Sequence, residues 1–136
     1  MGQKILIVDD DVLIHQLYQH HLQRAGYEVI AATNGVEGIE VAARELPQLI
    51  IMDVMMEGMD GLAALRELKK MEATSAIPVI VITGNVAAHE AARHESELAG
   101  AALFLTKPFS PARLLSEVQR LVPGPSPASS PGGSGK

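Results

Sequence analysis

The sequence contains no cysteine and no tryptophan, and aromatic residues make up only 3% of its 136 residues. Without cysteine there is no disulfide framework and no thiolate chemistry, which excludes small disulfide-stapled folds and cysteine-based catalysis. The hydrophobic residues, 47% of the chain, are therefore mostly aliphatic. A chain of this length is expected to form about one domain, whose core needs no staple.

Long apolar segments and positive charge are also scarce. No apolar run approaches the roughly 20 residues of a membrane span, and the N-terminus lacks the pattern of a secretory signal. Lysine and arginine number 11 against 16 aspartates and glutamates, which gives a net charge of −5. Because phosphate-backbone binding needs clustered basic residues, we expect no direct nucleic-acid binding. The lack of a membrane span, a secretory signal and cysteine leads us to expect a cytoplasmic protein without membrane binding.

Five short apolar runs divide the chain, and most are continuous and rich in β-branched residues. This pattern is typical of strands that are covered on both faces. The runs are KILIV at 4–8, YEVIAA at 27–32, LIIM at 49–52, PVIVIT at 78–83 and ALFL at 102–105. We expect each run to form one strand.

The segments that follow these runs have the apolar spacing of helices. Asp11, Asn34 and Ser110 are suitable N-caps, and Pro111 suits the first helical position. The positions expected to face the core are Leu13, Ile14, Leu17, Tyr18, Leu22 and Ala25; Val36, Ile39, Ala43 and Leu46; Leu62, Leu65 and Leu68; and Leu114, Leu115, Val118 and Leu121. A further helix, rich in Ala and Glu, is expected over about 86–98. The alternation predicts an α/β fold, a (βα)5 doubly wound parallel sheet.

The last segment has a different composition. Residues 123–136 are rich in Pro, Gly and Ser and contain no apolar residue larger than Ala. Such a segment cannot contribute to a core, so we expect a flexible linker or tail after a domain of residues 1–122.

Polar residues follow four of the five predicted strands. Asp9 and Asp10 follow the first, Asp53 the third, Thr83 the fourth and Lys107 the fifth. In open α/β sheets, ligands bind at the carboxyl ends of the strands. A lone aspartate there is usually a cap or turn residue. The coincidence at four strand ends is what indicates a functional site.

Three carboxylates at one edge would repel each other by roughly 4 kcal/mol per close pair unless a cation lies among them. Oxygen ligands of this kind suit Mg²⁺. With Lys107 as a positive charge and Thr83 as a hydroxyl, the edge could hold a phosphoryl group, and phosphoryl transfer onto a carboxylate is the indicated reaction.

Two other functions are considered from the residues. A phosphotransferase of the haloacid dehalogenase type would need a second Asp two residues after Asp53, where this chain has Met55. A constitutive docking module could keep the fold without the chemistry, although the complete set of polar residues argues against it. The histidine pairs His20/His21 and His89/His94 lack the spacing of a zinc site and are expected to be solvated.

Four motifs together resemble the receiver domain of bacterial two-component response regulators, the CheY-like family. They are ILIVDDD, LIIMDVMMEGMDG, VIVITGN and FLTKPF, in that order, and the resemblance covers about residues 4–122. It implies a flavodoxin-like single domain with strand order 2-1-3-4-5.

The resemblance also implies roles for individual residues. Asp53 would be the phosphoacceptor, taking a phosphoryl group from a sensor histidine kinase or a histidine phosphotransfer protein. Mg²⁺ would be bound by Asp10, Asp53 and the backbone carbonyl of Met55, with Asp9 acting through water.

Further implied roles concern the phosphoryl group and the response to it. Thr83, Lys107 and the backbone N–H of Gly84 would bind the phosphoryl group, and Thr83 and Phe104 would switch on phosphorylation. Residues 86–121 would carry the face for an output domain or target protein. The chain would be a switch that catalyses only its own phosphorylation and dephosphorylation, not an enzyme acting on a metabolite.

Overall fold

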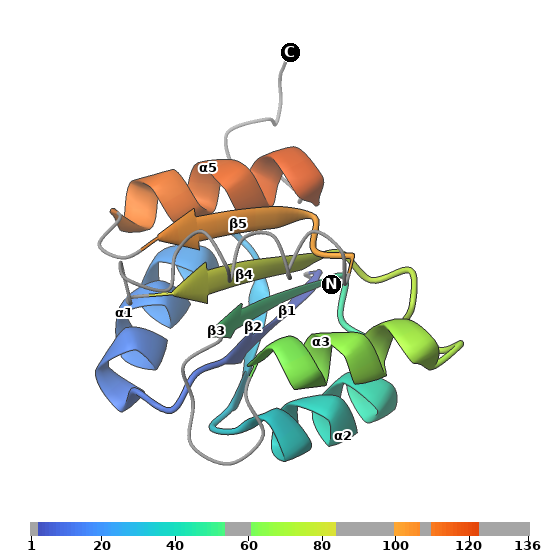
Figure 1. The fold of residues 1–136 in the computed structure, drawn as a ribbon. Helices are drawn as coiled ribbons and strands as arrows, with labels where there is room; N and C mark the ends of the chain where they lie inside the picture. The colour runs from blue at the N-terminus through green and yellow to red at the C-terminus, as the bar shows by residue number, and fades with distance from the viewer. Residues whose placement is uncertain (1–2, 54–60, 84–99, 107–109, 123–136) are drawn as a thin grey trace.

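The computed structural model describes residues 3–53, 61–83, 100–106 and 110–122 (Figure 1). Its elements are β1 (Lys4–Val8), α1 (Val12–Arg24), β2 (Glu28–Ala32), α2 (Gly35–Glu45), β3 (Leu49–Asp53), α3 (Gly61–Lys70), β4 (Val79–Thr83), β5 (Leu103–Thr106) and α5 (Pro111–Leu121). All five predicted strands are present within one residue of their expected bounds. The helix expected over about 86–98 lies outside the described residues.

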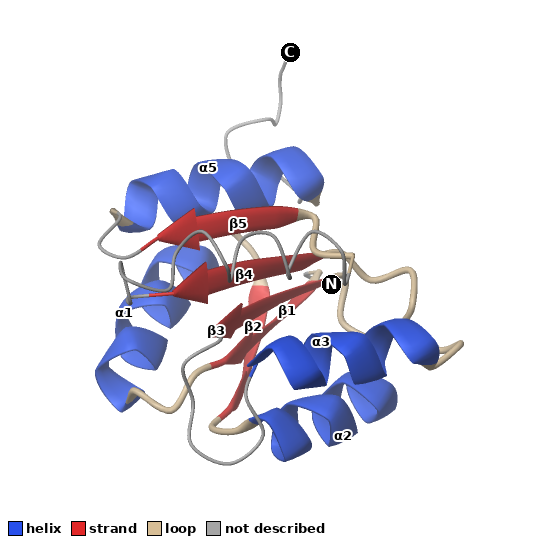
Figure 2. Ribbon diagram, viewed as in Figure 1, coloured by secondary structure: helices blue, strands red, loops and turns tan. Residues whose placement is uncertain are grey.

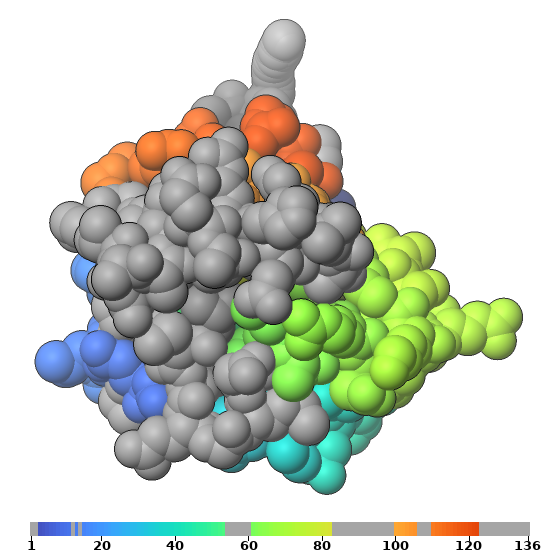
Figure 3. All heavy atoms as spheres, viewed as in Figure 1, coloured from blue at the N-terminus to red at the C-terminus, as the bar shows by residue number. Residues whose placement is uncertain are grey.

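The strands form one parallel sheet in the order β2-β1-β3-β4-β5, which confirms the predicted doubly wound topology. Helices cover both faces of the sheet: α2 and α3 lie on one face, and α1 and α5 on the other (Figure 2). The space-filling view shows α2 and α3 side by side on one flank of the molecule (Figure 3). Parallel strands put all their carboxyl ends at one edge, where the polar residues were predicted to meet.

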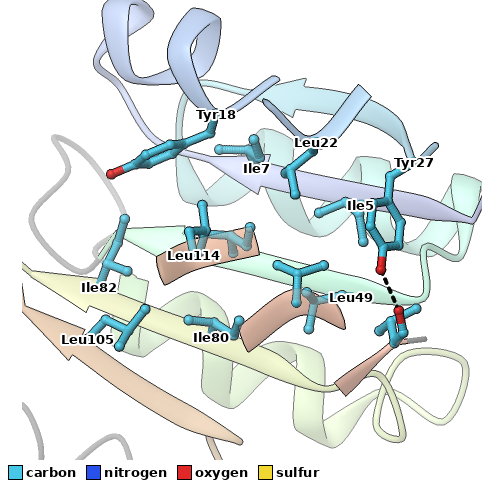
Figure 4. Packing of buried hydrophobic residues seen from close by; sticks show 13 residues of the cluster. Ile5, Ile7, Tyr18, Leu22, Tyr27, Leu49, Ile80, Ile82, Leu105 and Leu114 are labelled. Atoms are coloured by element: carbon cyan, nitrogen blue, oxygen red, sulfur yellow. Dashed lines mark hydrogen bonds between the residues drawn. The ribbon is translucent and has the colours of Figure 1, made fainter. Parts of the chain in front are cut away.

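Each face of the sheet has its own hydrophobic core, which explains why the strands are continuously apolar. Alternate residues of a strand point to opposite faces, so Leu6 and Val8 pack toward α2 and α3 whereas Ile5 and Ile7 pack toward α1 and α5. Figure 4 shows the second of these cores, in which the hydroxyl of Tyr27 donates a 2.7 Å hydrogen bond to the carbonyl oxygen of Val122. This bond ties the end of α5 to the start of β2.

The predicted core faces of α3 and α5 are confirmed. Leu65 and Leu68 are fully buried, and Leu114 and Val118 are at most 1% exposed. The predicted caps of α2 and α5 are confirmed as well. The side chain of Asn34 accepts a hydrogen bond from the Glu37 backbone N–H, and Ser110 accepts one from Arg113.

The predicted core face of α1 was partly wrong. Tyr18 and Leu22 are buried as expected, but Leu13 is 74% exposed and Leu17 is 44% exposed. His15, three residues before Tyr18, is buried in their place. The two leucines form a second, overlapping helical stripe, and spacing alone could not decide which stripe faces the sheet.

The predicted core face of α2 was partly wrong: Ile39 packs against the core as expected, but the other three residues do not. The expected residues Val36 and Leu46 are about half exposed, and Ala43 is exposed. The buried residues of the helix are Gly35, Gly38, Val41 and Ala42. Three of these four residues are Gly or Ala because the helix lies very close to the sheet, and the side chains of Val36 and Leu46 stay outside.

Leu46 caps the C-terminus of α2 in the left-handed region, with φ of 49° and ψ of 61°. A side chain with a Cβ is strained there, whereas glycine is not. We expect Leu46→Gly to raise the free energy of unfolding by about 0.5–1 kcal/mol, because glycine relieves this strain. Little packing is lost, since about half of the leucine side chain is exposed to solvent. Urea denaturation checks this.

The control for this prediction is Ala43→Gly, an exposed position of the same helix. It should lower the free energy of unfolding by about 1 kcal/mol, since glycine costs helix propensity there. If Leu46→Gly proved as destabilising as Ala43→Gly, strain at Leu46 would not be the dominant effect.

Candidate metal centre

Three carboxylates converge at the carboxyl edge of the sheet. Asp9 and Asp10 follow β1, and Asp53 is the last residue of the neighbouring strand β3. One carboxylate oxygen from each lies within 4.8 Å of the other two. Asp9 and Asp53 are 0% and 4% exposed, whereas Asp10 is exposed. The structure thus brings together the three acidic residues that the sequence predicted to meet.

Backbone groups fix Asp9 in this cluster. Its N–H donates a 3.1 Å hydrogen bond to the carbonyl oxygen of Ala32 in β2. Its carboxylate Oδ1 accepts a 2.9 Å hydrogen bond from the backbone N–H of Asp11. The Asp11 carboxylate in turn accepts a hydrogen bond from the Leu13 N–H, 2.9 Å long, which confirms Asp11 as the N-cap of α1. The three consecutive aspartates therefore have different roles.

The donor set fits a hard divalent cation such as Mg²⁺. Its ligands are oxygens, which Mg²⁺ prefers, and neighbouring ligands of an octahedral Mg²⁺ lie about 3 Å apart. Carboxylate oxygens within 4.8 Å of one another need only a small contraction to reach that spacing. A divalent cation would also offset the repulsion between two buried carboxylates. Asp9, Asp10 and Asp53 are therefore the residues that could hold the metal.

The other predicted site residues are only partly within the described residues. Thr83 is the last residue of β4, paired in register with Thr106 of β5, so its backbone lies at the same edge as the carboxylates. Phe104 lies in β5, partly buried against the core on the α2 and α3 face. Met55, Gly84 and Lys107 lie outside the described residues, and the roles predicted for all five residues stay predictions.

His15 was not among the site residues predicted from the sequence. Its side chain is only 6% exposed, and its ring nitrogen Nε2 is hydrogen-bonded to the backbone carbonyl oxygen of Asp9. The spacing of His15, Tyr18 and Leu22 places all three on one helical face, but the competing stripe of Leu13 and Leu17 kept this signal from identifying the histidine. His20, by contrast, is exposed as predicted.

Two charged side chains outside the cluster have shifted pKa values. The ammonium of Lys4, 3.0 Å from the carboxylate of Glu45, holds the pKa of Glu45 below its usual range. Burial lowers the pKa of Lys69, whose ammonium donates hydrogen bonds to the carbonyl oxygens of Ser75 and Ile77. Both groups bridge neighbouring segments of the chain, which is a structural role.

Comparison with known proteins yields one consistent family. The family model described as the response regulator receiver domain matches residues 5–119. The Protein PilH of Pseudomonas aeruginosa is 36% identical over 121 residues, covering 89% of this chain and 98% of that protein. No helix in the described ranges is long and apolar enough to cross a membrane.

Solved structures agree with this match. The chemotaxis protein CheY4 of Vibrio cholerae superimposes with a TM-score of 0.83 at 33% identity, covering 90% of this chain and all of that one. The receiver domain of the sensor histidine kinase PA1611 from Pseudomonas aeruginosa superimposes with a TM-score of 0.81 at 31% identity, covering 90% of this chain and 99% of that one. That structure holds a magnesium ion in its active site cleft. The chain spans only about half the length of the transcriptional regulators that it matches.

Proposed function

This chain belongs to the response regulator receiver domain family, and we propose that it accepts a phosphoryl group on Asp53 from a sensor histidine kinase or a histidine phosphotransfer protein. The observation that carries the proposal is the convergence of Asp9, Asp10 and Asp53 at the carboxyl edge of the sheet. Phosphorylation would switch a partner-binding face in two-component signal transduction, which takes place in the cytoplasm.

The chemistry we propose is a single phosphoryl transfer. A carboxylate oxygen of Asp53 attacks the phosphorus of a phosphohistidine; the new O–P bond forms as the P–N bond breaks, and the electron pair stays on the imidazole nitrogen. Asp10, Asp53 and the backbone carbonyl of Met55 would hold Mg²⁺, with Asp9 acting through water. The metal would neutralise charge on the transferred group.

The remaining proposed roles concern binding and response. Lys107, the Thr83 hydroxyl and the backbone N–H of Gly84 would bind the phosphoryl oxygens. Movement of Thr83 and Phe104 would follow, since the phosphoryl group adds about 1.5 to 2 negative charges at the edge of the sheet. Residues 86–121, which include β5 and α5, would present the altered face to an output domain or target protein.

We also propose that residues 1–122 form the receiver and that 123–136 form a linker or tail. In this organisation the chain is a signalling module that catalyses only its own phosphorylation and dephosphorylation. Membership of the receiver family argues against a phosphotransferase of the haloacid dehalogenase type. Met55 also stands where that chemistry needs an aspartate. The docking module without chemistry remains the competing function.

The test is incubation of the full chain with acetyl phosphate or phosphoramidate and Mg²⁺, followed by intact mass spectrometry. We expect the mass of one phosphoryl group to be added, and to be absent in Asp53→Asn and in excess EDTA. Asp11→Asn is the matched control, because Asp11 caps α1 and should leave incorporation unchanged. Failure of the native chain to gain a phosphoryl group would favour the docking module.

A further inference from the structure

His15 is buried directly beneath the turn that carries the acidic residues. Its side chain is 6% exposed, and its Nε2 is hydrogen-bonded to the backbone carbonyl oxygen of Asp9. Its backbone N–H donates a 3.2 Å hydrogen bond to the carbonyl oxygen of Asp11. The histidine therefore contacts the turn through both its side chain and its backbone, from the first turn of α1.

The hydrogen bond to Asp9 fixes where the imidazole carries its proton. A carbonyl oxygen can only accept a hydrogen bond, so Nε2 must be the protonated nitrogen. The other ring nitrogen, Nδ1, is buried, and no hydrogen-bond partner for it occurs in the described part of the chain. A leucine at this position would fill a similar space without leaving a buried polar atom unmatched. The side chain is thus poorly explained by packing alone.

Asp9, Asp11 and the two ends of the turn are joined by a short chain of hydrogen bonds. Asp9 is attached to β2 through its N–H, to Asp11 through its carboxylate, and to α1 through its carbonyl oxygen and His15. Because the Asp9 carbonyl belongs to the peptide unit that leads into Asp10, the imidazole restrains the orientation of both residues. Mutation of groups that orient metal ligands typically lowers metal affinity or activity 10–100-fold.

We propose that His15 is a positioning residue for the magnesium site, which holds the Asp9–Asp10 peptide in the orientation that directs both carboxylates toward Asp53. It acts through the N–H of Nε2 and does not contact the metal. The inference rests on the proposed function only in its assumption that Asp9, Asp10 and Asp53 bind Mg²⁺.

The test compares two replacements of His15 in the full chain by isothermal titration with Mg²⁺ at one fixed, slightly alkaline pH. His15→Gln keeps an N–H donor near the position of Nε2, whereas His15→Leu keeps the volume and removes the donor. We expect His15→Leu to weaken Mg²⁺ binding about tenfold or more, and His15→Gln to stay within about threefold of the native affinity. His20→Leu, at an exposed position of the same helix, is the matched control and should bind as the native chain does.

Thermal unfolding in EDTA shows whether a variant with weakened Mg²⁺ binding is also less stably folded. Equal losses of affinity in His15→Leu and His15→Gln, or native affinity in His15→Leu, would overturn the proposal. If His15→Leu does not fold, the native chain still provides a test. A long-range ¹H–¹⁵N correlation spectrum of the imidazole should show a protonated Nε2, and an unprotonated Nε2 would overturn the proposal.

The titration with Mg²⁺ contains no phosphoryl donor, so its outcome is independent of the phosphorylation test. The proposed function and the proposed role of His15 can therefore be refuted separately. A chain that binds Mg²⁺ with the expected dependence on His15 but gains no phosphoryl group refutes only the proposed function. A chain that is phosphorylated but binds Mg²⁺ equally well in all variants refutes only the role of His15. Absence of Mg²⁺ binding by the native chain would overturn both.

Discussion

Replacing Asp9 with asparagine is expected to raise the free energy of unfolding of the metal-free protein by about 1–2 kcal/mol and to remove most of its stabilisation by Mg²⁺. Two charges about 5 Å apart repel by roughly 3–4 kcal/mol at an effective dielectric constant of 20. The Asp10 partner is exposed and its contribution is screened, so the expected gain is smaller than that figure. Asparagine can still accept the hydrogen bond from the Asp11 N–H, which keeps the turn intact.

The sign of the effect should reverse when Mg²⁺ is added. A native protein saturated at 100 times its dissociation constant gains about 2.7 kcal/mol, because the ion binds only the folded state. Asp9→Asn removes one oxygen charge from the site and should lose most of this gain. Urea unfolding in EDTA and in excess MgCl₂ measures both halves of the prediction, with the variant more stable in the first buffer and less stable in the second.

Asp11→Asn is the control, because it changes the same charge two residues away at the N-cap of α1. Asparagine caps helices about as well as aspartate, so stability should change by no more than a few tenths of a kcal/mol in either buffer. A loss of metal-free stability in Asp9→Asn, or full retention of Mg²⁺ stabilisation, would contradict an electrostatic cluster built to hold a cation.

The sheet and its acidic edge could be predicted from the sequence for a topological reason. Continuous apolar runs mark buried parallel strands, and parallel strands necessarily bring their carboxyl ends to one edge. Asp9, Asp10 and Asp53 could therefore be placed together without knowing any distance. The strand order itself followed from the family resemblance, since several orders satisfy the same alternation of strands and helices.

The faces of α1 and α2 could not be predicted in the same way. The prediction gave large apolar side chains to the core, but Leu13 and Leu46 are exposed, while His15 and Gly38 are buried. Which stripe faces inward depends on how near each helix lies to the sheet and on what the turn before it requires. These are tertiary properties that a single helix does not encode. The histidine was missed for this reason.

Gly38→Ala is expected to lower the free energy of unfolding by about 1–3 kcal/mol, although alanine is the better helix former. A Cβ at this position would lie 2.9 Å from Cγ2 and 3.1 Å from Cγ1 of Val8. Val8 is fully buried in β1, and its β-branched side chain has few alternative rotamers, so α2 or the strand must shift. Urea unfolding of the metal-free protein measures the loss.

A double-mutant cycle with Val8→Ala tests whether this contact is the cause. Val8→Ala alone should cost about 2–3 kcal/mol through the cavity that it leaves, and the alanine at 38 should partly fill that cavity. The loss of stability in the double variant should therefore be about 1–2 kcal/mol smaller than the sum of the two single losses. Additive losses would show that the cost of Gly38→Ala arises elsewhere.

The same displacement should reach the metal centre, because Val8 directly precedes Asp9. If Gly38→Ala pushes the end of β1, Mg²⁺ affinity measured by titration should fall along with stability, and Val8→Ala should restore part of it in the double variant. Ala43→Gly, on the exposed side of α2, should change stability without changing Mg²⁺ affinity. Unchanged affinity in Gly38→Ala would mean that the turn at Asp9 and Asp10, held by Asp11 and His15, absorbs the shift before it reaches the carboxylates.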